Sequence, residues 1–254
     1  MSIIACFKWT IDEEDIRIRA DGTLDFSIAK KKISDYDRNV IEAAAQLATK
    51  TEKQVIGLTF GNSEAKPSLK DALSRGLDEA YWLNCEEAQD ADGAATARAL
   101  ARAINMIGDI DLVVCAEGSS DVYARQTAPR IGALLDWPVV TSAISMEFEE
   151  EKLLATRKLD DGLEKVAVEL PAVISVLPEI CTPPIPTLMA ILGAGKKQVT
   201  EFNKDDLGID LEPKVLVNET KGYVMDRKNI VLDEGSAEDR VAELVGLLQK
   251  EGVL

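Results

Sequence analysis

Apolar runs and amphipathic stretches alternate along the first half of this chain, and that alternation restricts the folds open to it. Five short runs have the composition of buried strands, and the segments between them carry apolar residues at helical spacing. The predicted strands are Ile3–Phe7, Gln54–Phe60, Ala80–Leu83, Asp111–Ala116 and Pro138–Thr141. The predicted helices are Asp35–Lys50, Pro67–Arg75, Gly93–Met106 and Asp121–Leu135. Such alternation predicts a doubly wound, mainly parallel α/β sheet with strand order 3-2-1-4-5.

A hairpin is predicted after this alternating region. Its two strands, Leu153–Leu159 and Glu164–Leu170, flank Asp160-Asp161-Gly162, which has the composition of a tight turn. Val166, Val168 and Leu170 alternate with more polar neighbours, as in a half-buried strand. We expect this hairpin to be added to the edge of the parallel sheet.

The character of the chain changes beyond the hairpin. Pro183, Pro184 and Pro186 are incompatible with a regular strand ladder, and few aliphatic residues follow before a final helix that begins near Ser236. This tail has too little apolar content to fold alone. We therefore predict an α/β nucleotide-binding domain over residues 1–182 and a C-terminal arm over 183–254 that packs on the main domain or on a partner subunit.

Composition limits the classes of function. Asp and Glu number 45 against 29 Lys and Arg, and the net charge of −16 disfavours binding to nucleic acid or anionic lipid. No run approaches about 18 uninterrupted apolar residues, so we expect no stable membrane insertion. The start of the chain lacks the layout of a signal peptide, and a cytoplasmic location is the default expectation. The chain has no histidine, and its four cysteines lack metal-site spacing, which excludes histidine-dependent catalysis and predicts no metal site.

The predicted strand order places a ligand site between strands one and four. Ligands in such sheets bind at the carboxyl ends of the strands, where the winding direction reverses. The segment Cys6-Phe7-Lys8 ends the first strand, and Gly118-Ser119-Ser120-Asp121 follows the fourth. Gly118 would let the backbone approach a ligand, and Ser119 and Ser120 would cap a following helix whose free N–H groups suit phosphate. The turn that begins at Gly61 is a weaker cradle of the same kind.

Two common nucleotide-binding signatures are missing from the sequence. No G-x-G-x-x-G follows the first strand, which removes the fingerprint of dinucleotide dehydrogenases. No G-x-x-x-x-G-K-[ST] occurs, so the chain is not a P-loop nucleotidase. Nothing else in the sequence performs redox chemistry unaided, and we predict no catalytic residues.

The hairpin carries the most specific signal in the chain. It has Arg157, then an acidic pair with Gly162, then Glu164, and finally Pro171 with a following aliphatic pair. This order resembles the signature of the beta subunit of electron-transfer flavoproteins, and the carnitine-associated branch is the most similar. Ser175 departs mildly, because Thr, Ala or Cys is more frequent at that place. The resemblance extends over essentially the whole chain and implies an adenine-nucleotide alpha-hydrolase-like fold.

The resemblance also implies which residues hold an adenine nucleotide. Cys6 and Phe7 match the end of the first strand, which contacts the adenosine, and Ser34 takes the place of a frequent Asn. Asp121, Gln126 and Thr127 match the nucleotide-binding segment, and Thr127 resembles the threonine of AMP-binding members. Two departures affect the ligand. Phe60 stands where small residues are usual and would narrow the pocket. Asp121-Val122-Tyr123-Ala124 replaces the Asp-Gly-Asp-Thr run of electron-bifurcating relatives, so AMP and a second FAD both stay open.

The resemblance implies an electron carrier rather than an enzyme. The redox FAD would be held mainly by an alpha subunit, with this chain forming one wall of that site. Electrons would arrive from an acyl-CoA dehydrogenase or a ferredoxin-like donor and leave toward a reductase or quinone-linked acceptor. Leu188 and Met189, within the region Thr187–Lys197, would dock the dehydrogenase. The opposing possibility is that Leu188 and Ile191 are buried against the sheet of this chain.

Two other classes of nucleotide-binding protein share a sheet of this kind. A stand-alone adenine-nucleotide-binding protein of the stress type would share the sheet and act as a homodimeric sensor. That class favours a glycine-rich phosphate loop late in the domain and does not need a long tail. A nucleotide alpha-hydrolase would need a Ser-Gly-Gly type loop after the first strand, where this chain has Lys8-Trp9-Thr10.

Overall fold

The computed structural model describes residues 2–223 and 227–254. These residues divide into two compact units. The first extends to Arg17 and resumes over Asp25–Thr220, and the second combines Ile18–Leu24 with Lys221–Leu254. The predicted division at residue 182 follows a different criterion and stays a prediction. Among the described residues, no helix has the length and apolar character needed to cross a bilayer.

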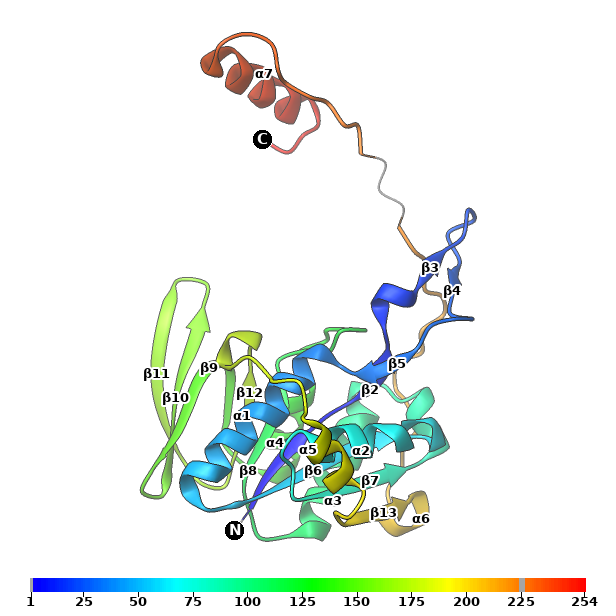
Figure 1. The fold of residues 1–254 in the computed structure, drawn as a ribbon, viewed down its shortest axis with the longest axis vertical. Coiled ribbons are helices and arrows are strands. Elements are labelled where there is room, and N and C mark those ends of the chain that lie inside the picture. Colours follow the sequence, from blue (N-terminus) through cyan, green and yellow to red (C-terminus); the bar gives the residue numbers. More distant parts are fainter. Residues whose placement is uncertain (1, 224–226) are drawn as a thin grey trace. The chain divides into compact units, whose positions relative to one another are not determined.

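A nine-stranded sheet forms the centre of the first unit, with the order β11-β10-β9-β12-β8-β1-β6-β7-β13 (Figure 1). The strands are β1 (Ser2–Cys6), β6 (Gln54–Gly61), β7 (Glu79–Asn84), β8 (Ile110–Ala116), β9 (Val139–Glu149), β10 (Lys152–Leu159), β11 (Gly162–Glu169), β12 (Ala172–Val176) and β13 (Val199–Asn203). The pairs from β9 through β12, β8, β1, β6 and β7 to β13 are parallel, whereas β9, β10 and β11 pair antiparallel. The predicted doubly wound, mainly parallel α/β fold is confirmed.

Helices cover both faces of this sheet. One core lies under α1 (Asp35–Thr51) and α2 (Lys66–Ser74), and the other lies under α3 (Gly93–Ile107) and α4 (Thr127–Leu135) (Figure 1). Each helix turns a stripe of apolar residues toward the strands, as in α1, where Val40, Ile41, Ala44 and Leu47 are buried. The two faces correspond to alternate residues of the strands, because successive side chains of a strand point in opposite directions.

The position of β12 differs from the predicted strand order. The fifth predicted strand was expected beside the fourth, but β12 lies between β8 and β9. All five residues of β12 are buried, and such a run is most stable with a paired neighbour on each side. Val139 begins a strand that continues to Glu149, far beyond the predicted end at Thr141, and leads into the β10–β11 hairpin. The chain therefore runs outward along β9 to the hairpin at the edge of the sheet, and then returns to the parallel part of the sheet as β12.

Helix α4 begins later than predicted. It starts at Thr127 rather than at Asp121, and the intervening loop contains Tyr123 and Arg125 with φ values of 49° and 56°. This left-handed backbone cannot continue a right-handed helix. Ser119 and Ser120 consequently do not cap a helix, which corrects that prediction. Pro129 is the third residue of α4. The N–H groups of the first turn have no partner within the helix, so a proline at this position removes no helical hydrogen bond and does not require a kink.

The remaining elements are short. The segment between β1 and α1 contains β2 (Trp9–Ile11) paired with β5 (Lys31–Ile33), and β3 (Arg17–Ile18) paired with β4 (Leu24–Asp25) around a turn at Asp21-Gly22. The 3-10 turns are η1 (Glu13–Asp15), η2 (Ser63–Ala65), η3 (Glu86–Gln89) and η4 (Pro178–Ile180). The tail is more ordered than expected, because it contributes a strand to the sheet. It forms α5 (Leu188–Ala194), β13 beside β7, α6 (Lys204–Leu207) and α7 (Ala237–Lys250).

Candidate functional site

The direction of winding reverses between β1 and β8. From β1 the chain crosses to β6 and β7 on one side, and it then returns to β8 on the other side. The residues that follow β1 and β8 therefore meet at one edge of the sheet. Lys8 Nζ lies 2.5 Å from Asp121 Oδ2, and Ser119 Oγ donates a hydrogen bond of 2.5 Å to Asp121 Oδ1. The structure thus brings together three of the predicted site residues.

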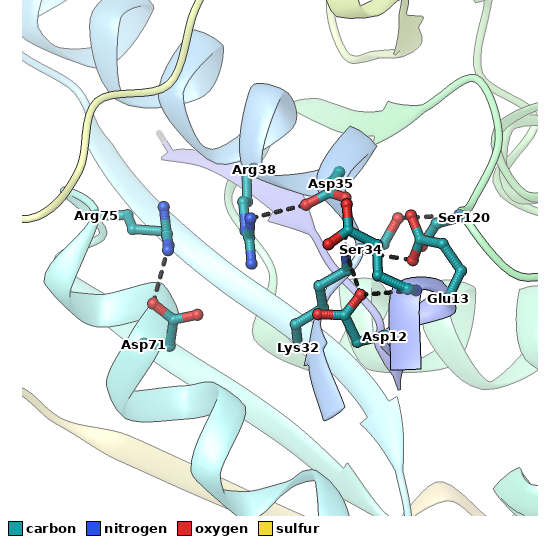
Figure 2. A network of polar contacts seen from close by, with 10 residues as sticks. Asp12, Glu13, Lys32, Ser34, Asp35, Arg38, Asp71, Arg75 and Ser120 are labelled. Atoms are coloured by element: carbon teal, nitrogen blue, oxygen red, sulfur yellow. Dashed lines mark hydrogen bonds and ion pairs between the residues drawn. The ribbon is translucent and has the colours of Figure 1, made fainter. Parts of the chain in front are cut away.

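Ser34 joins both of these loops to the start of α1. It is the N-cap residue of α1 and is fully buried. Its N–H donates to the carbonyl oxygen of Lys8 at 3.1 Å, and its Oγ accepts a hydrogen bond of 3.3 Å from the N–H of Ser120 (Figure 2). The hydroxyl of Ser34 therefore holds the loop after β8 instead of capping its own helix.

Asp37 is the most perturbed acidic group of the site. It is buried, and its Oδ2 accepts a hydrogen bond of 2.8 Å from the backbone N–H of Lys8. Burial raises the pKa of Asp37 to about 7, against the opposing effects of the Lys8 N–H and ammonium, and nearby Asp121 adds to the rise. Burial also acts to raise the pKa of Asp121, but the ion pair with Lys8 and the hydrogen bonds from Ser119 and the N–H of Val122 together outweigh burial and hold that pKa below the ordinary value.

Sequence reasoning missed Asp37, although a signal for it existed. It occupies the third position of α1, and a carboxylate in the first turn of a helix is favourably placed against the helix dipole. The predicted packing of that helix on β1 would have brought this residue close to the strand end at Lys8. Its charged neighbours Asp35 and Arg38 have the pattern of a helix turn that is exposed to solvent, so the sequence does not indicate that Asp37 is buried.

A tyrosine fills the space in front of Gly118. A Cβ atom at Gly118 would lie only 2.4 Å from the ring of Tyr123, so a side chain cannot be accommodated there without movement of the loop. The Tyr123 ring also packs against Tyr36, with the ring centroids 5.2 Å apart, and beneath the guanidinium of Arg125. The glycine thus permits close packing of the loop on itself. Its role toward a ligand stays a prediction.

Cys6 and Phe7 lie beneath the polar cluster. Both are buried, and the N–H of Phe7 donates to the carbonyl oxygen of Leu58 on β6. Hydrogen bonding to Cys115 on β8, together with burial, raises the pKa of the Cys6 thiol. These two residues form the apolar floor of the strand end, and the thiol remains neutral at physiological pH.

Four further predicted residues do not join this cluster through any hydrogen bond that the described part of the chain shows. Gln126 Oε1 accepts from Arg130 Nε at 3.1 Å and faces Gly93 at the start of α3. Thr127 is the first residue of α4. Phe60 packs on the core beneath α3, and the carbonyl oxygen of Gly61 accepts from the indole of Trp82 at 3.2 Å. Their predicted contacts with a nucleotide stay predictions.

Two buried hydroxyls near these strand ends are suited to an adenine nucleotide. Among the described residues, Thr59 Oγ1 near the end of β6 and Ser120 Oγ after β8 are buried without a hydrogen-bond partner. A buried hydroxyl is normally satisfied, and phosphate or ribose oxygens would supply the missing partners. The Lys8 ammonium and the Asp121 carboxylate suit the same two groups. No cluster of potential metal ligands occurs in residues 2–223 and 227–254.

The hairpin signature surrounds a second polar centre, which the sequence did not reveal. Glu117 is buried at the end of β8, where its Oε2 accepts from Ser175 Oγ at 2.5 Å and from the N–H of Ser142 at 2.9 Å. Arg157 Nε donates to the carbonyl oxygen of Thr141 at 2.9 Å, and its Nη1 binds Glu164 Oε2 at 2.7 Å. Arg157 on β10 thus links β9 to β11, and Glu117 after β8 links β9 to β12.

The fold and the polar cluster define a doubly wound α/β protein with polar residues gathered at its topological switch point, the place where sheets of this kind bind ligands. A scan against models of known families matches the electron transfer flavoprotein domain over residues 23–207. The chain belongs to the electron transfer flavoprotein family, which confirms the family predicted from the hairpin. Proteins of this family are flavin-associated electron carriers rather than enzymes. The assignment to the carnitine-associated branch stays a prediction.

Proposed function

We propose that this chain is the beta-type subunit of a heterodimeric electron-transfer flavoprotein and that it holds an adenine nucleotide, AMP or FAD, at the carboxyl ends of β1 and β8. The observation that carries this proposal is the meeting of Lys8, Ser34 and Asp121 at the switch point of a chain that belongs to this family. The Lys8 ammonium would balance the phosphate charge, and the Asp121 carboxylate would accept hydrogen bonds from ribose hydroxyls. Family membership favours this carrier role over a stand-alone stress-type protein.

In this proposal the redox FAD occupies a site separate from the nucleotide site of this chain. An alpha subunit would hold the redox FAD, which supplies the electron-accepting chemistry, and this chain would contribute one wall of that site. Acyl-CoA dehydrogenases or similar donors would deliver electrons, and a reductase or quinone-linked acceptor would remove them. The role of this chain is therefore positioning and docking, with no bond made or broken by its side chains.

Co-expression with an alpha subunit tests this role directly. We expect a yellow one-to-one complex, and we expect this chain alone to be colourless. Acid extraction followed by quantification of AMP and FAD per heterodimer would identify the nucleotide held by this chain. A chain that purifies as a homomer, contains no purine and does not bind the alpha subunit would contradict the proposal.

Removing the Asp121 carboxylate should weaken the proposed nucleotide site. We expect Asp121→Ala to lower nucleotide affinity in the heterodimer by about 1–3 kcal/mol, the usual range for losing a polar contact that a bound ligand shields from water. Asp161→Ala, in the exposed hairpin turn, is the matched control and should leave affinity unchanged. Equal nucleotide retention in the two variants, or tighter binding after the release of Lys8, would exclude Asp121 as a ligand of the ribose.

The exposed face of α5 is the proposed docking element for an electron donor. Leu188 and Met189 are 71% and 77% exposed and Ile191 is 38% exposed, which supports docking over burial of Leu188 and Ile191 against the sheet of this chain. Replacing both by Ala should slow electron transfer from an acyl-CoA dehydrogenase by about 10-fold, a typical effect of losing an apolar anchor. The flavin spectrum should not change. Leu163→Ala on β11, at a similarly exposed position, is the control, and equal rates in both proteins would contradict docking by α5.

A further inference from the structure

A cavity lies away from the switch point, between α1, the end of α2 and the proline-rich segment before α5. Its volume is about 220 Å³, roughly seven times the 30 Å³ that one water molecule occupies in the liquid. Arg38 and Glu42 reach it from α1, and Arg75 reaches it from the end of α2. The Pro183–Pro186 segment and Ala190 of α5 provide an apolar wall.

Hydrogen bonds at both ends of the proline-rich segment hold the cavity open. Before it, Asn39 Nδ2 donates to the carbonyl oxygens of Cys181 at 2.6 Å and Pro178 at 3.1 Å. After it, Lys197 Nζ donates to the carbonyl oxygens of Leu73 at 3.1 Å and Leu77 at 2.5 Å. The first pair ties the segment to α1 and the second ties it to the end of α2. Prolines between these two anchors have restricted backbone freedom, so the wall is preformed.

Each arginine of the cavity is oriented by one aspartate. Asp35 Oδ1 accepts from Arg38 Nη1 at 2.7 Å, and Asp71 Oδ1 accepts from Arg75 Nε at 2.9 Å. Asp35 also binds Lys32 through its other oxygen at 2.8 Å, so only part of its charge is directed at Arg38. Figure 2 shows the two guanidinium groups in the space between α1 and α2, each held by its aspartate from its own helix.

These contacts leave donors of both guanidinium groups available to a ligand. Arg38 Nε is buried and has no hydrogen-bond partner among the described residues. Arginine has five N–H donors in a planar fork that matches a carboxylate, and the aspartates occupy only one nitrogen of each group. A buried donor without a partner is unfavourable, and an oxyanion bound beside Arg38 Nε would remove that cost.

We propose that this cavity binds a small aliphatic monocarboxylate, with its carboxylate between Arg38 and Arg75 and its carbon chain against the proline-rich wall. The apolar wall favours an organic anion over inorganic phosphate. Glu42 also lines the cavity, and its carboxylate opposes a second negative charge on the ligand. Its Oε1 accepts from Gln46 at 2.6 Å, which holds that carboxylate in place. The site therefore selects a singly charged ligand.

Ligand-observed NMR and calorimetry with butyrate test this proposal on the full chain and on its heterodimer. We expect saturable binding of butyrate in the millimolar range or tighter, and none of butyramide, which has the same shape without the charge. Arg75→Gln and Arg38→Gln should each weaken binding at least about 10-fold, the effect of losing a charge-assisted hydrogen bond. Arg17→Gln, at an exposed position of β3, is the matched control and should bind butyrate normally.

Three results would overturn the proposal. These are no saturable butyrate binding, equal binding of butyramide, and butyrate binding that survives both arginine substitutions. Phosphate that competes as well as butyrate would show a general anion site and would contradict selection of a monocarboxylate. Should Arg38→Gln fail to fold, Arg75→Gln and the butyramide comparison still decide the outcome. A carboxylate that reaches the cavity only on the side chain of a docked protein would leave free butyrate unbound, which also contradicts the proposal.

Discussion

Replacing Asp37 by asparagine should stabilise the protein increasingly as the pH rises from 5 to 8. The pKa of Asp37 is about 7 in the folded protein because burial disfavours its charge, against an ordinary value of 3.8. Between those two values the folded state binds more protons than the unfolded state, so this carboxyl lowers stability as the pH rises. Its unfavourable effect is small below pH 4 and complete above pH 7. Asparagine carries no charge and removes this dependence.

The expected size follows from the difference between the two pKa values. Each unit corresponds to about 1.4 kcal/mol, and the interval from pH 5 to pH 8 includes about two of the three units. The stability gain of Asp37→Asn over the original protein should therefore grow by about 2–3 kcal/mol across that interval. The amide oxygen can still accept the hydrogen bond from the N–H of Lys8, which preserves the start of α1.

Urea unfolding of the original and Asp37→Asn proteins at a series of pH values measures this effect. The charged groups around Asp37 are Lys8 and Asp121, and Asp121 keeps its charge between pH 5 and pH 8 because its pKa is held below the ordinary value. Asp161→Asn in the exposed hairpin turn is the control and should show a difference that is independent of pH. A pH-independent difference for Asp37→Asn as well would place the pKa of Asp37 in its ordinary range.

The parts of the fold that the sequence predicts well are those in which local pattern and tertiary environment agree. Gln54–Phe60 was predicted as a strand and β6 ends at Gly61, because an apolar run in the centre of a sheet is buried on both faces. The alternation in the second half of β9 was visible, since Met146 and Phe148 alternate with glutamates. No local pattern predicts that this alternation continues the strand that begins at Val139, because the left-handed Ser142 between the two parts shifts the register with β12.

The start of α4 shows the opposite case, in which tertiary contacts override local preference. The segment after Asp121 contains no strong helix breaker before Pro129, so its sequence is compatible with a helix. In the structure, Tyr123 packs over Gly118 and against Tyr36, and these contacts hold the backbone in a left-handed conformation. Packing of this kind depends on residues far away in sequence, and no local pattern reports it.

The sequence predicts those parts of the candidate site whose positions follow from the order of the strands alone. The switch-point rule places Lys8 and Asp121 at one strand edge, and the structure pairs them. The rule does not reveal which charged residues become buried. Asp37 and Glu117 each stand among other polar residues, where a carboxylate is normally solvated, and only the packing of α1 and β12 encloses them.

Replacing Glu117 by alanine should destabilise the protein by about 2–4 kcal/mol, because the buried Ser175 hydroxyl and the partly buried N–H of Ser142 then lose their acceptor. Ser142 N and Ser175 Oγ both donate to the same oxygen of Glu117, and they belong to the neighbouring strands β9 and β12. Glutamine keeps an acceptor oxygen at this place, so Glu117→Gln should cost less, about 1 kcal/mol. Glu179→Ala is the surface control, since its pair with Lys158 is exposed and should contribute less than about 1 kcal/mol.

Denaturant unfolding of these three variants separates the buried hydrogen bonds from a simple loss of charge. The order of destabilisation should be Glu117→Ala, then Glu117→Gln, then Glu179→Ala. Because Glu117 directly precedes Gly118, its loss should also loosen the loop that carries Ser120 and Asp121. Nucleotide retention by the heterodimer should then fall in the same order as stability. If Glu117→Ala unfolds at the same denaturant concentration as Glu179→Ala, the carboxylate at the end of β8 does not hold β9 and β12 together, and the hairpin signature must stabilise this edge through Arg157 alone.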